Sequence, residues 1–287
     1  RVAFRELTDA GGKIGAFFPS IYRVNYRNHR KIAIIDGVAG FIGGFNIGDD
    51  YLGKGPLGYW RDTALQVVGP AAWALQLRFF LDWNYTTGEG LRLNSHYFPD
   101  TGTPGTTPIQ IVSSGPDTRW SPIKDGYINL INSARESVYI QTPYFIPDDS
   151  VTDALRIAAL SGVDVRIMIP CKPDHIFVYW ATLSFIGDLL EAGVRAYTYD
   201  AGFLHAKTIV VDREAGSVGS ANWDVRSFRL NFEANAFFYD AAVGAELAGA
   251  FEEDLSVCTE ITLENYRARP IEIRLKESIS RLFSPLA

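Results

Sequence analysis

Two stretches of this chain carry the same pattern, 176 positions apart. The first reads His29-Arg30-Lys31-Ile32-Ala33-Ile34-Ile35-Asp36 and continues to Ala39-Gly40, Gly43 and Asn46. The second reads His205-Ala206-Lys207-Thr208-Ile209-Val210-Val211-Asp212 and continues to Ala215-Gly216, Gly219 and Asn222. Seven identities at one fixed offset indicate an internal duplication, so we expect two similar halves that meet at one site.

The second copy lies within a regular alternation of strands and helices. Strands are expected at 108–112, 137–142, 163–170, 194–199, 205–211 and 233–239, and helices at 121–135, 150–160, 175–192 and 241–255. This alternation predicts an α/β fold, with a mixed or parallel sheet covered by helices. Around the first copy, strands at 31–35 and 62–68 and a helix at 71–84 show only the end of the same plan. The first domain is therefore expected to be truncated at its N-terminus.

These patterns divide the chain into three segments. Residues 1–85 are expected to form the C-terminal part of the first domain, and residues 108–287 the second domain. Residues 86–107, rich in Gly, Thr and Pro, are expected to link them. With 287 residues, 47% of them hydrophobic, the chain can bury a core in each domain.

Composition excludes several classes of protein. The net charge of −6 lacks the basic footprint of most nucleic-acid binders, so a nucleic-acid partner is not expected. Two cysteines do not make a disulfide scaffold. No Cys/His cluster has zinc spacing, and neither a metal nor a cofactor is expected. The least polar stretch, 176–187, is too short to span a bilayer.

The repeated residues suit phosphate chemistry. Alternate residues of a strand face the same side, so each His-x-Lys presents an imidazole beside an ammonium. The ammonium attracts phosphate oxygens, and the imidazole can attack or transfer a proton near neutral pH. An asparagine after each glycine turn can donate to the same phosphate. A cage for one phosphodiester is thus expected from His29, Lys31, Asn46, His205, Lys207 and Asn222.

A single His-x-Lys would be better explained as a surface strand with a satisfied histidine, but two copies with matching flanks favour the catalytic interpretation. Asp36 and Asp212 lie five positions beyond the lysines and are expected to shape turns rather than to act chemically. Asp62 and Glu233 begin equivalent downstream strands. They are candidates to orient the histidines, with plain solvated strand ends as the alternative.

Two further groups are weaker candidates. Lys172 and His175 follow a strand end, where ligands bind in α/β sheets, and could line the site. Aromatic residues near the motifs could line a lipid path, although core packing is the commoner role of such residues. They are Tyr144, Phe145, Tyr179, Trp180 and Trp223.

The pattern His-x-Lys-x4-Asp-x6-Gly-[Gly/Ser]-x-Asn, present twice, resembles the signature of the phospholipase D superfamily. Four stretches resemble bacterial cardiolipin synthases more narrowly: 25–31, 141–147, 202–207 and 219–233. The resemblance implies two α-β-α sandwich domains with mixed sheets and the active site at their interface. It also implies N-terminal membrane helices, which are expected to be missing from this stretch of sequence, and catalytic domains on the cytoplasmic side of the bacterial cell membrane.

The resemblance further implies a phosphatidyltransferase that needs no metal. It would condense two phosphatidylglycerol molecules to cardiolipin and glycerol through a phosphatidyl-histidine. His29 would be the nucleophile and His205 the acid/base, with the reverse assignment open. The lysines and asparagines would stabilise charge on the phosphoryl oxygens. Alternatives are a phospholipase D hydrolase, a nucleic-acid phosphodiesterase, and a scaffold that binds phospholipid without turnover. The partners expected are phosphatidylglycerol and the membrane surface.

Overall fold

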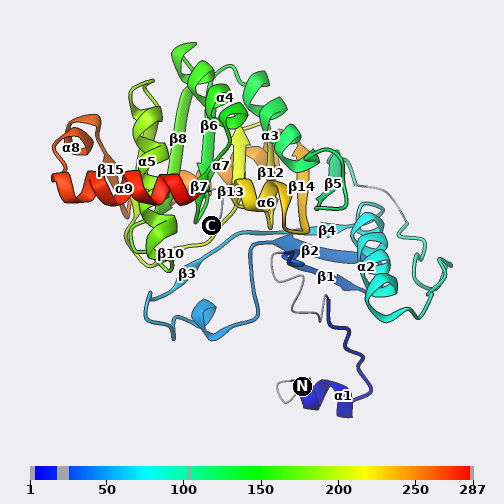
Figure 1. The fold of residues 1–287 in the computed structure, drawn as a ribbon. Helices are drawn as coiled ribbons and strands as arrows, with labels where there is room; N and C mark the ends of the chain where they lie inside the picture. Colours follow the sequence, from blue (N-terminus) through cyan, green and yellow to red (C-terminus); the bar gives the residue numbers. More distant parts are fainter. Residues whose placement is uncertain (1–3, 18–25, 103–104, 285–287) are drawn as a thin grey trace.

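An eight-stranded mixed sheet organises the second half of the chain (Figure 1). The computed structural model describes residues 4–17, 26–102 and 105–284. The strand order is β15-β9-β8-β6-β11-β12-β14-β5. The strands are β5 (Ile109–Ser114), β6 (Ser137–Gln141), β8 (Asp164–Pro170), β9 (Arg195–Tyr199), β11 (Thr208–Val211), β12 (Ala215–Gly219), β14 (Glu233–Tyr239) and β15 (Cys258–Ile261). β6, β8 and β9 are mutually parallel, and the other neighbours pair antiparallel.

Helices cover both faces of this sheet. α3 (Pro122–Ser133), α4 (Asp149–Leu160) and α5 (Ile176–Leu190) pack on one face, and α7 (Ala241–Leu255) packs on the other. The alternation of side chains along each strand supplies both cores. On β6, for example, Ile140 joins the core under α3–α5, whereas Tyr139 stacks on Phe251 of α7. The expected α-β-α sandwich is confirmed for this half.

The first half contributes a smaller antiparallel sheet of order β1-β2-β4, made of β1 (Ile32–Ile35), β2 (Ala39–Gly43) and β4 (Ala64–Val68). α2 (Ala72–Thr87) covers it, and α1 (Arg5–Asp9) and the short helix η3 (Asp49–Leu52) lie outside it. Ile42 and Val67 of this sheet pack against Ala234 and Ala236 of β14. The two halves therefore share a third hydrophobic core.

Short backbone pairings tie the halves together. β3 (Trp60–Arg61) pairs in parallel with β10 (Phe203–Leu204), and an isolated bridge joins Asn28 to Phe232. Another parallel pair, β7 (Phe145–Ile146) with β13 (Trp223–Asp224), lies within the second half. In Figure 1 the β3 segment runs from the first half to β10 beneath the large sheet. Both cross-half pairings directly precede residues of the predicted site.

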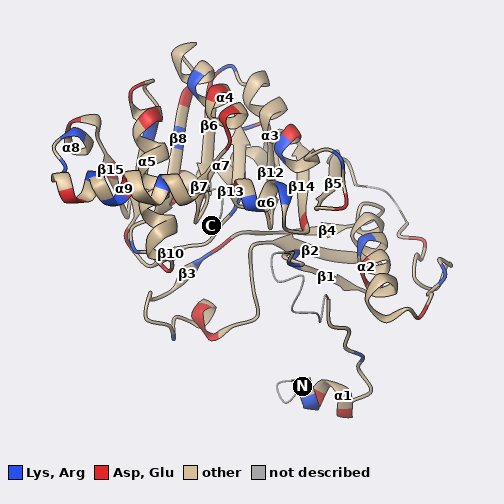
Figure 2. Cartoon of the chain, in the orientation of Figure 1, with Lys and Arg blue, Asp and Glu red and all other residues tan. Residues whose placement is uncertain are grey.

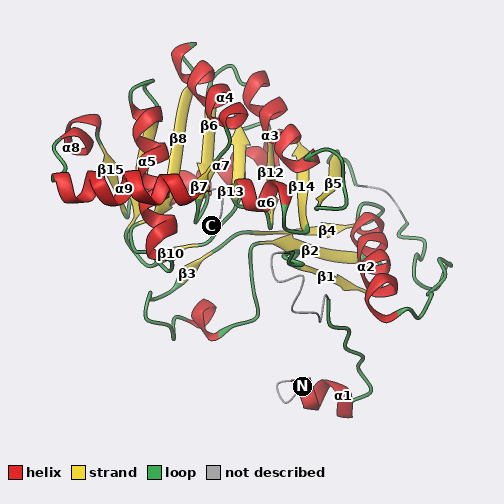
Figure 3. Cartoon of the chain, in the orientation of Figure 1, coloured by secondary structure: helices red, strands yellow, loops and turns green. Residues whose placement is uncertain are grey.

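The motif strands begin later than the alternation predicted. β1 begins at Ile32 and β11 at Thr208, so neither histidine lies on its sheet ladder. The reason is that each histidine N–H bonds to the other half, as described below. The predicted strand 205–211 was in this respect too long. Beyond 255 the prediction named no element, whereas the structure adds β15, α8 (Leu263–Arg267) and α9 (Ile271–Phe283) (Figure 3).

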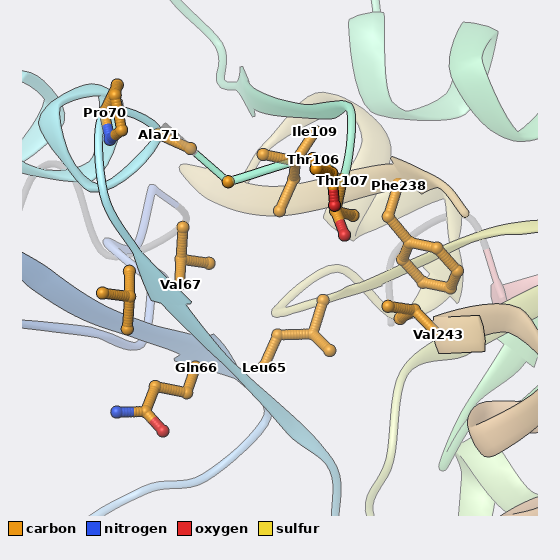
Figure 4. Close-up of a pocket in the computed structure, with 12 residues that line it drawn as sticks. Leu65, Gln66, Val67, Pro70, Ala71, Thr106, Thr107, Ile109, Phe238 and Val243 are labelled. Atoms are coloured by element: carbon orange, nitrogen blue, oxygen red, sulfur yellow. The ribbon is translucent and has the colours of Figure 1, made fainter. Parts of the chain in front are cut away.

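A cavity of about 550 Å³ lies at the junction of the two sheets (Figure 4). Leu65 and Val67 reach it from β4, and Ile109 and Phe238 from the large sheet. The histidines of the two motifs do not line it. In the part of the chain that the structure describes, no helix is long and apolar enough to cross a bilayer.

Candidate active site

The two motif histidines are each held by a carboxylate from the opposite half. His29 Nδ1 lies 2.9 Å from Glu233 Oε1, and His205 Nδ1 lies 2.7 Å from Asp62 Oδ2. Both carboxylate side chains are fully buried. A carboxylate on Nδ1 fixes the tautomer and leaves Nε2 for chemistry. The site is therefore assembled only where the two halves meet.

Backbone hydrogen bonds produce this crossed arrangement. The N–H of His29 donates to the carbonyl of Phe232, the residue before Glu233, at 2.9 Å. The N–H of His205 donates to the carbonyl of Arg61, the residue before Asp62, at 2.7 Å. Because each histidine is aligned beside the residue that precedes the other half's carboxylate, the two side chains meet.

Different groups support the two carboxylates. Glu233 accepts hydrogen bonds from Ser220 Oγ at 2.5 Å and from Asn231 Nδ2 at 3.2 Å. Asp62 accepts one from the Tyr51 hydroxyl at 3.3 Å, and that hydroxyl also lies 2.9 Å from His205 Nδ1. Gly44 stands where the second motif has Ser220, and a Cβ there would lie 2.2 Å from Asp62 Oδ1. Glycine at 44 thus leaves the room that Asp62 needs.

The two lysines lie between these pairs. Lys207 is fully buried, with Nζ 2.8 Å from His205 Nδ1, and Lys31 Nζ donates to the carbonyl of His29 at 2.7 Å. Burial lowers the pKa of Lys31 from its usual value to about 8 and that of Lys207 to about 7, although Asp62 and Glu233 oppose the shift in both. An anion entering the site would restore both charges.

The electrostatics of His205 and of Glu233 follow from their burial and their neighbours. Burial, with the neighbouring Lys207 ammonium, lowers the pKa of His205 to about 3, so its imidazole is neutral at pH 7. Burial raises the pKa of Glu233, but the His29 imidazole and the donors around it outweigh burial and hold the pKa below its usual value. The Glu233 carboxylate is therefore charged and can stabilise a proton on His29.

One cavity, of about 690 Å³, opens onto His29. Asn222 lines it beside the histidine, with its side chain buried. Tyr144 and Asp174, joined by a hydrogen bond between hydroxyl and carboxylate, form another part of the wall. Arg27 and Arg226 add positive charge. The cavity therefore gives a small ligand access to the His29 side chain.

Comparisons with known proteins agree with this geometry. Residues 127–255 match the family model described as "Cardiolipin synthase, PLD-like domain". The chain is 59% identical over 290 residues to "Major cardiolipin synthase ClsA" of Bacillus subtilis (strain 168), a match that covers 99% of this chain and 60% of that protein. The chain is thus similar to proteins of the phospholipase D superfamily.

Within the superfamily it resembles bacterial cardiolipin synthases. It is 54% identical over 289 residues to "Cardiolipin synthase" of Staphylococcus aureus (strain Mu50 / ATCC 700699), covering 98% of this chain and 58% of that one. It thus spans about three fifths of these relatives' length. The crystal structure of phosphatidylserine synthase from Haemophilus influenzae Rd KW20 matches with a TM-score of 0.66 at 14% identity, over 92% of this chain and 70% of that one. That likeness shows the shared phospholipase D fold.

The phospholipase D-type site brings together most of the predicted residues. Asn46 differs: it is exposed and, together with Lys31, lines a separate hollow of about 420 Å³. Asp36 and Asp212 adopt left-handed backbone angles, φ 54° and 51°. Asp212 also accepts hydrogen bonds from the backbone N–H groups of residues 135–137, at 2.8–2.9 Å. It fastens the turn after β11 to the start of β6.

Of the weaker candidates, some line the cavity that contains His29 and others do not. His175 lines the cavity with His29, whereas Lys172 does not. Of the aromatic candidates, Tyr144 lines the cavity, and Phe145 and Trp223 are completely buried in the core. In the part of the chain that the structure describes, no group of three or more His, Cys, Asp and Glu is arranged to hold a metal ion.

Sequence reasoning missed three supporting residues of the phospholipase D-type site, Tyr51, Ser220 and Asn231. Ser220 could have been found, since it replaces Gly44 in the aligned copies and its hydroxyl has a carboxylate within reach. Tyr51 has no counterpart in the second copy and lies beyond the first. Burial, together with Asp62, raises the pKa of Tyr51 above its usual value, so its hydroxyl remains a donor at neutral pH.

Proposed function

We propose that this chain carries out the cardiolipin synthase reaction, in which two phosphatidylglycerol molecules give cardiolipin and glycerol. The observation that carries the proposal is the crossed pairing of His29 with Glu233 and of His205 with Asp62. It gives two oriented imidazoles at one site, as a double displacement requires. The identity with relatives named cardiolipin synthases supports this substrate class.

In the first step, His29 Nε2 attacks the phosphorus of phosphatidylglycerol. His29 is assigned this role because it lines the open cavity, whereas His205 is buried. The bond from phosphorus to the glycerol oxygen breaks, and that oxygen takes a proton from His205. Since His205 is neutral in the free protein, it must gain this proton as the substrate binds. The negative phosphodiester favours that gain by stabilising the imidazolium.

In the second step, a hydroxyl of another phosphatidylglycerol attacks the phosphatidyl-histidine. His205 accepts the proton of that hydroxyl, the bond between phosphorus and His29 Nε2 breaks, and cardiolipin leaves. Lys31, Lys207 and Asn222 stabilise the charge on the phosphoryl oxygens in both transition states. Asn46 contributes from the edge of the site, where its Nδ2 lies 3.5 Å from the Tyr51 hydroxyl that contacts His205. Both steps balance without an oxidant, a reductant or a further group donor.

The domains, partners and location belong to the same proposal. Residues 1–85 form part of the first phospholipase D-like domain and residues 108–287 the second, with 86–107 as the linker, whose first two residues still belong to α2, which ends at Thr87. The substrate is drawn from a membrane surface, and the site works at the cytoplasmic side of a bacterial cell membrane. Arg27 and Arg226 in the cavity wall, which also contains Asp174 and Asp224, offer positive charge to an anionic lipid.

The experiment incubates the chain with phosphatidylglycerol vesicles, without CDP-diacylglycerol, and follows lipids by mass spectrometry. We expect cardiolipin and glycerol in equal amounts, abolished by His29→Ala and unchanged by His96→Ala, which alters an exposed linker histidine. Excess glycerol should convert cardiolipin back to phosphatidylglycerol. Phosphatidic acid as the sole product would instead identify a hydrolase, and the absence of any lipid product would overturn the proposal.

A further inference from the structure

The last helix, α9, exposes its apolar side and buries its polar side. Five apolar side chains recur at spacings of three and four residues, so they lie along one side of the helix. That side faces outward, with exposed fractions from 42% to 80%. The five residues, called here the apolar face of α9, are Ile271, Leu275, Ile279, Leu282 and Phe283.

The opposite side of α9 is polar and faces inward. Glu277 and Ser280 are buried there, and Arg269 Nη2 donates to Glu277 Oε2 at 2.6 Å. Arg281 also reaches α5, with its Nη2 2.6 Å from Asp188 Oδ2 and its Nη1 3.2 Å from the carbonyl of Ser184. Polar contacts therefore fix the orientation of α9 on α5. The outward position of the apolar face follows from that anchoring.

The apolar face continues to the mouth of the active-site cavity. Ser284, directly after α9, lines the cavity that contains His29. Ile176 and Phe177, exposed at the start of α5, line the same cavity. α9 packs on α5 (Figure 1), and Ser284 shares the cavity lining with Ile146 of β7, Asp224 of β13 and Val225 of α6. Apolar surface thus extends from Ile271 to the entrance of the site.

Positive charge accompanies this apolar surface. Lys276 lies on α9 with its ammonium 5.6 Å from the centre of the Trp180 ring, and Arg274 is exposed on the same helix. Arg226 and Arg229 lie on α6 (Val225–Arg229), and Figure 2 shows basic positions on both helices near the chain's C-terminal end. An apolar stripe with basic residues beside it is typical of helices that lie in the interface of an anionic bilayer.

We propose that the apolar face of α9 docks on the surface of an anionic phospholipid bilayer and thereby directs the active-site mouth towards the membrane. The inference rests on the proposed function, because a diacyl substrate keeps its chains in the bilayer while its headgroup enters the cavity. A bilayer covers the apolar face and brings phosphatidylglycerol to His29 in one orientation. Lys276 and Arg274 then meet the lipid phosphates.

The experiment compares three proteins: the wild type, the double variant Leu275→Glu/Leu282→Glu, and the control variant Leu160→Glu. Leu160 is 65% exposed at the end of α4, outside the apolar face of α9 and the cavity. Binding is measured by sedimentation with phosphatidylglycerol vesicles. Turnover is measured on those vesicles and on dihexanoyl-phosphatidylglycerol below its critical micelle concentration.

We expect the double variant to bind vesicles about a hundredfold more weakly, since each buried leucine is worth about tenfold or more in partitioning. Its turnover on vesicles should fall in parallel, its turnover on the dispersed short-chain lipid should not change, and Leu160→Glu should behave as the wild type. Unchanged vesicle binding would overturn the inference. A wild-type dimer that the double substitution dissociates would also overturn the inference, because a second copy of the chain would then cover the apolar face of α9.

Sedimentation does not depend on turnover, so the two proposals fail separately. If the wild type sediments with vesicles and the double variant does not, but no lipid product forms, the proposed reaction is contradicted and the docking surface is still supported. If the double variant makes cardiolipin on vesicles as fast as the wild type, the docking surface alone is contradicted.

Discussion

The two half-sites have the same residues at their centres and different surroundings. The side chain of His29 is 26% exposed and lines the cavity, whereas that of His205 is 8% exposed and lies against Lys207 and Tyr51. Serine and asparagine support Glu233, while a tyrosine and a glycine surround Asp62. A duplicated motif has thus acquired one accessible and one enclosed histidine, as expected where one group attacks and the other moves protons.

The largest expected effect tests this division of roles. Replacing either histidine by asparagine should lower kcat by about 10⁴-fold or more, the scale seen for members of a catalytic triad. Rapid denaturation in detergent at neutral pH, which spares the acid-labile phosphorus–nitrogen bond, should trap a protein-bound phosphatidyl group from lipid labelled at phosphorus in His205→Asn but not in His29→Asn. Label retained only in His29→Asn would reverse the assignment and make the enclosed histidine the nucleophile.

The lysines should rank next. Lys31→Ala and Lys207→Ala should each lower the rate by about 10²–10³-fold, because each removes a positive charge from the developing phosphoryl anion. Steady-state kinetics on phosphatidylglycerol measures the loss, and Lys13→Ala, which changes an exposed lysine paired with Glu89, is the control. Unchanged turnover in either motif variant would remove that half of the cage from the mechanism.

Tyr51→Phe and Ser220→Ala should separate the half-sites more finely. Each removes a donor to one carboxylate, so kcat should fall about tenfold. Each also leaves that carboxylate a stronger partner for its histidine. Tyr51→Phe should therefore raise the lowered pKa of His205 and move the alkaline limb of the pH–rate profile upward, whereas Ser220→Ala, which does not touch His205, should leave that limb in place. Identical profiles in the two variants would show that the roles are not divided in this way.

The smallest effect concerns stability. The folded-state pKa of His205, about 3, lies below its unfolded value, so the unfolded chain binds a proton that the folded chain does not. The free energy of unfolding should therefore decrease as the pH falls below about 6.5, by at most about 1.4 kcal/mol per pH unit from this group. Denaturant unfolding from pH 7 to 4.5 should be less pH-dependent in His205→Gln. An equal slope in both proteins would contradict a neutral, buried His205.

The sequence predicted the second half of the fold well because its strands and helices have clear periods. It also pointed to both histidines and both lysines, because duplication repeats them at one offset, and to both carboxylates, because they begin equivalent downstream segments 33 and 28 residues after their histidines. It did not show the crossed pairing, which depends on two short backbone contacts between distant segments, Asn28 with Phe232 and Leu204 with Arg61. It also missed α9, whose apolar residues look like those of a core helix until its polar side is seen to face inward.

The crossed hydrogen bonds also restrict how the two halves can change over generations. The Phe232 carbonyl that holds His29 directly precedes Glu233, and the Arg61 carbonyl that holds His205 directly precedes Asp62. An insertion or deletion of one residue at either point would move the carboxylate away from the histidine of the opposite half and disable that histidine. The duplicated segments are therefore inherited as a matched pair, and neither can drift in length there without its partner.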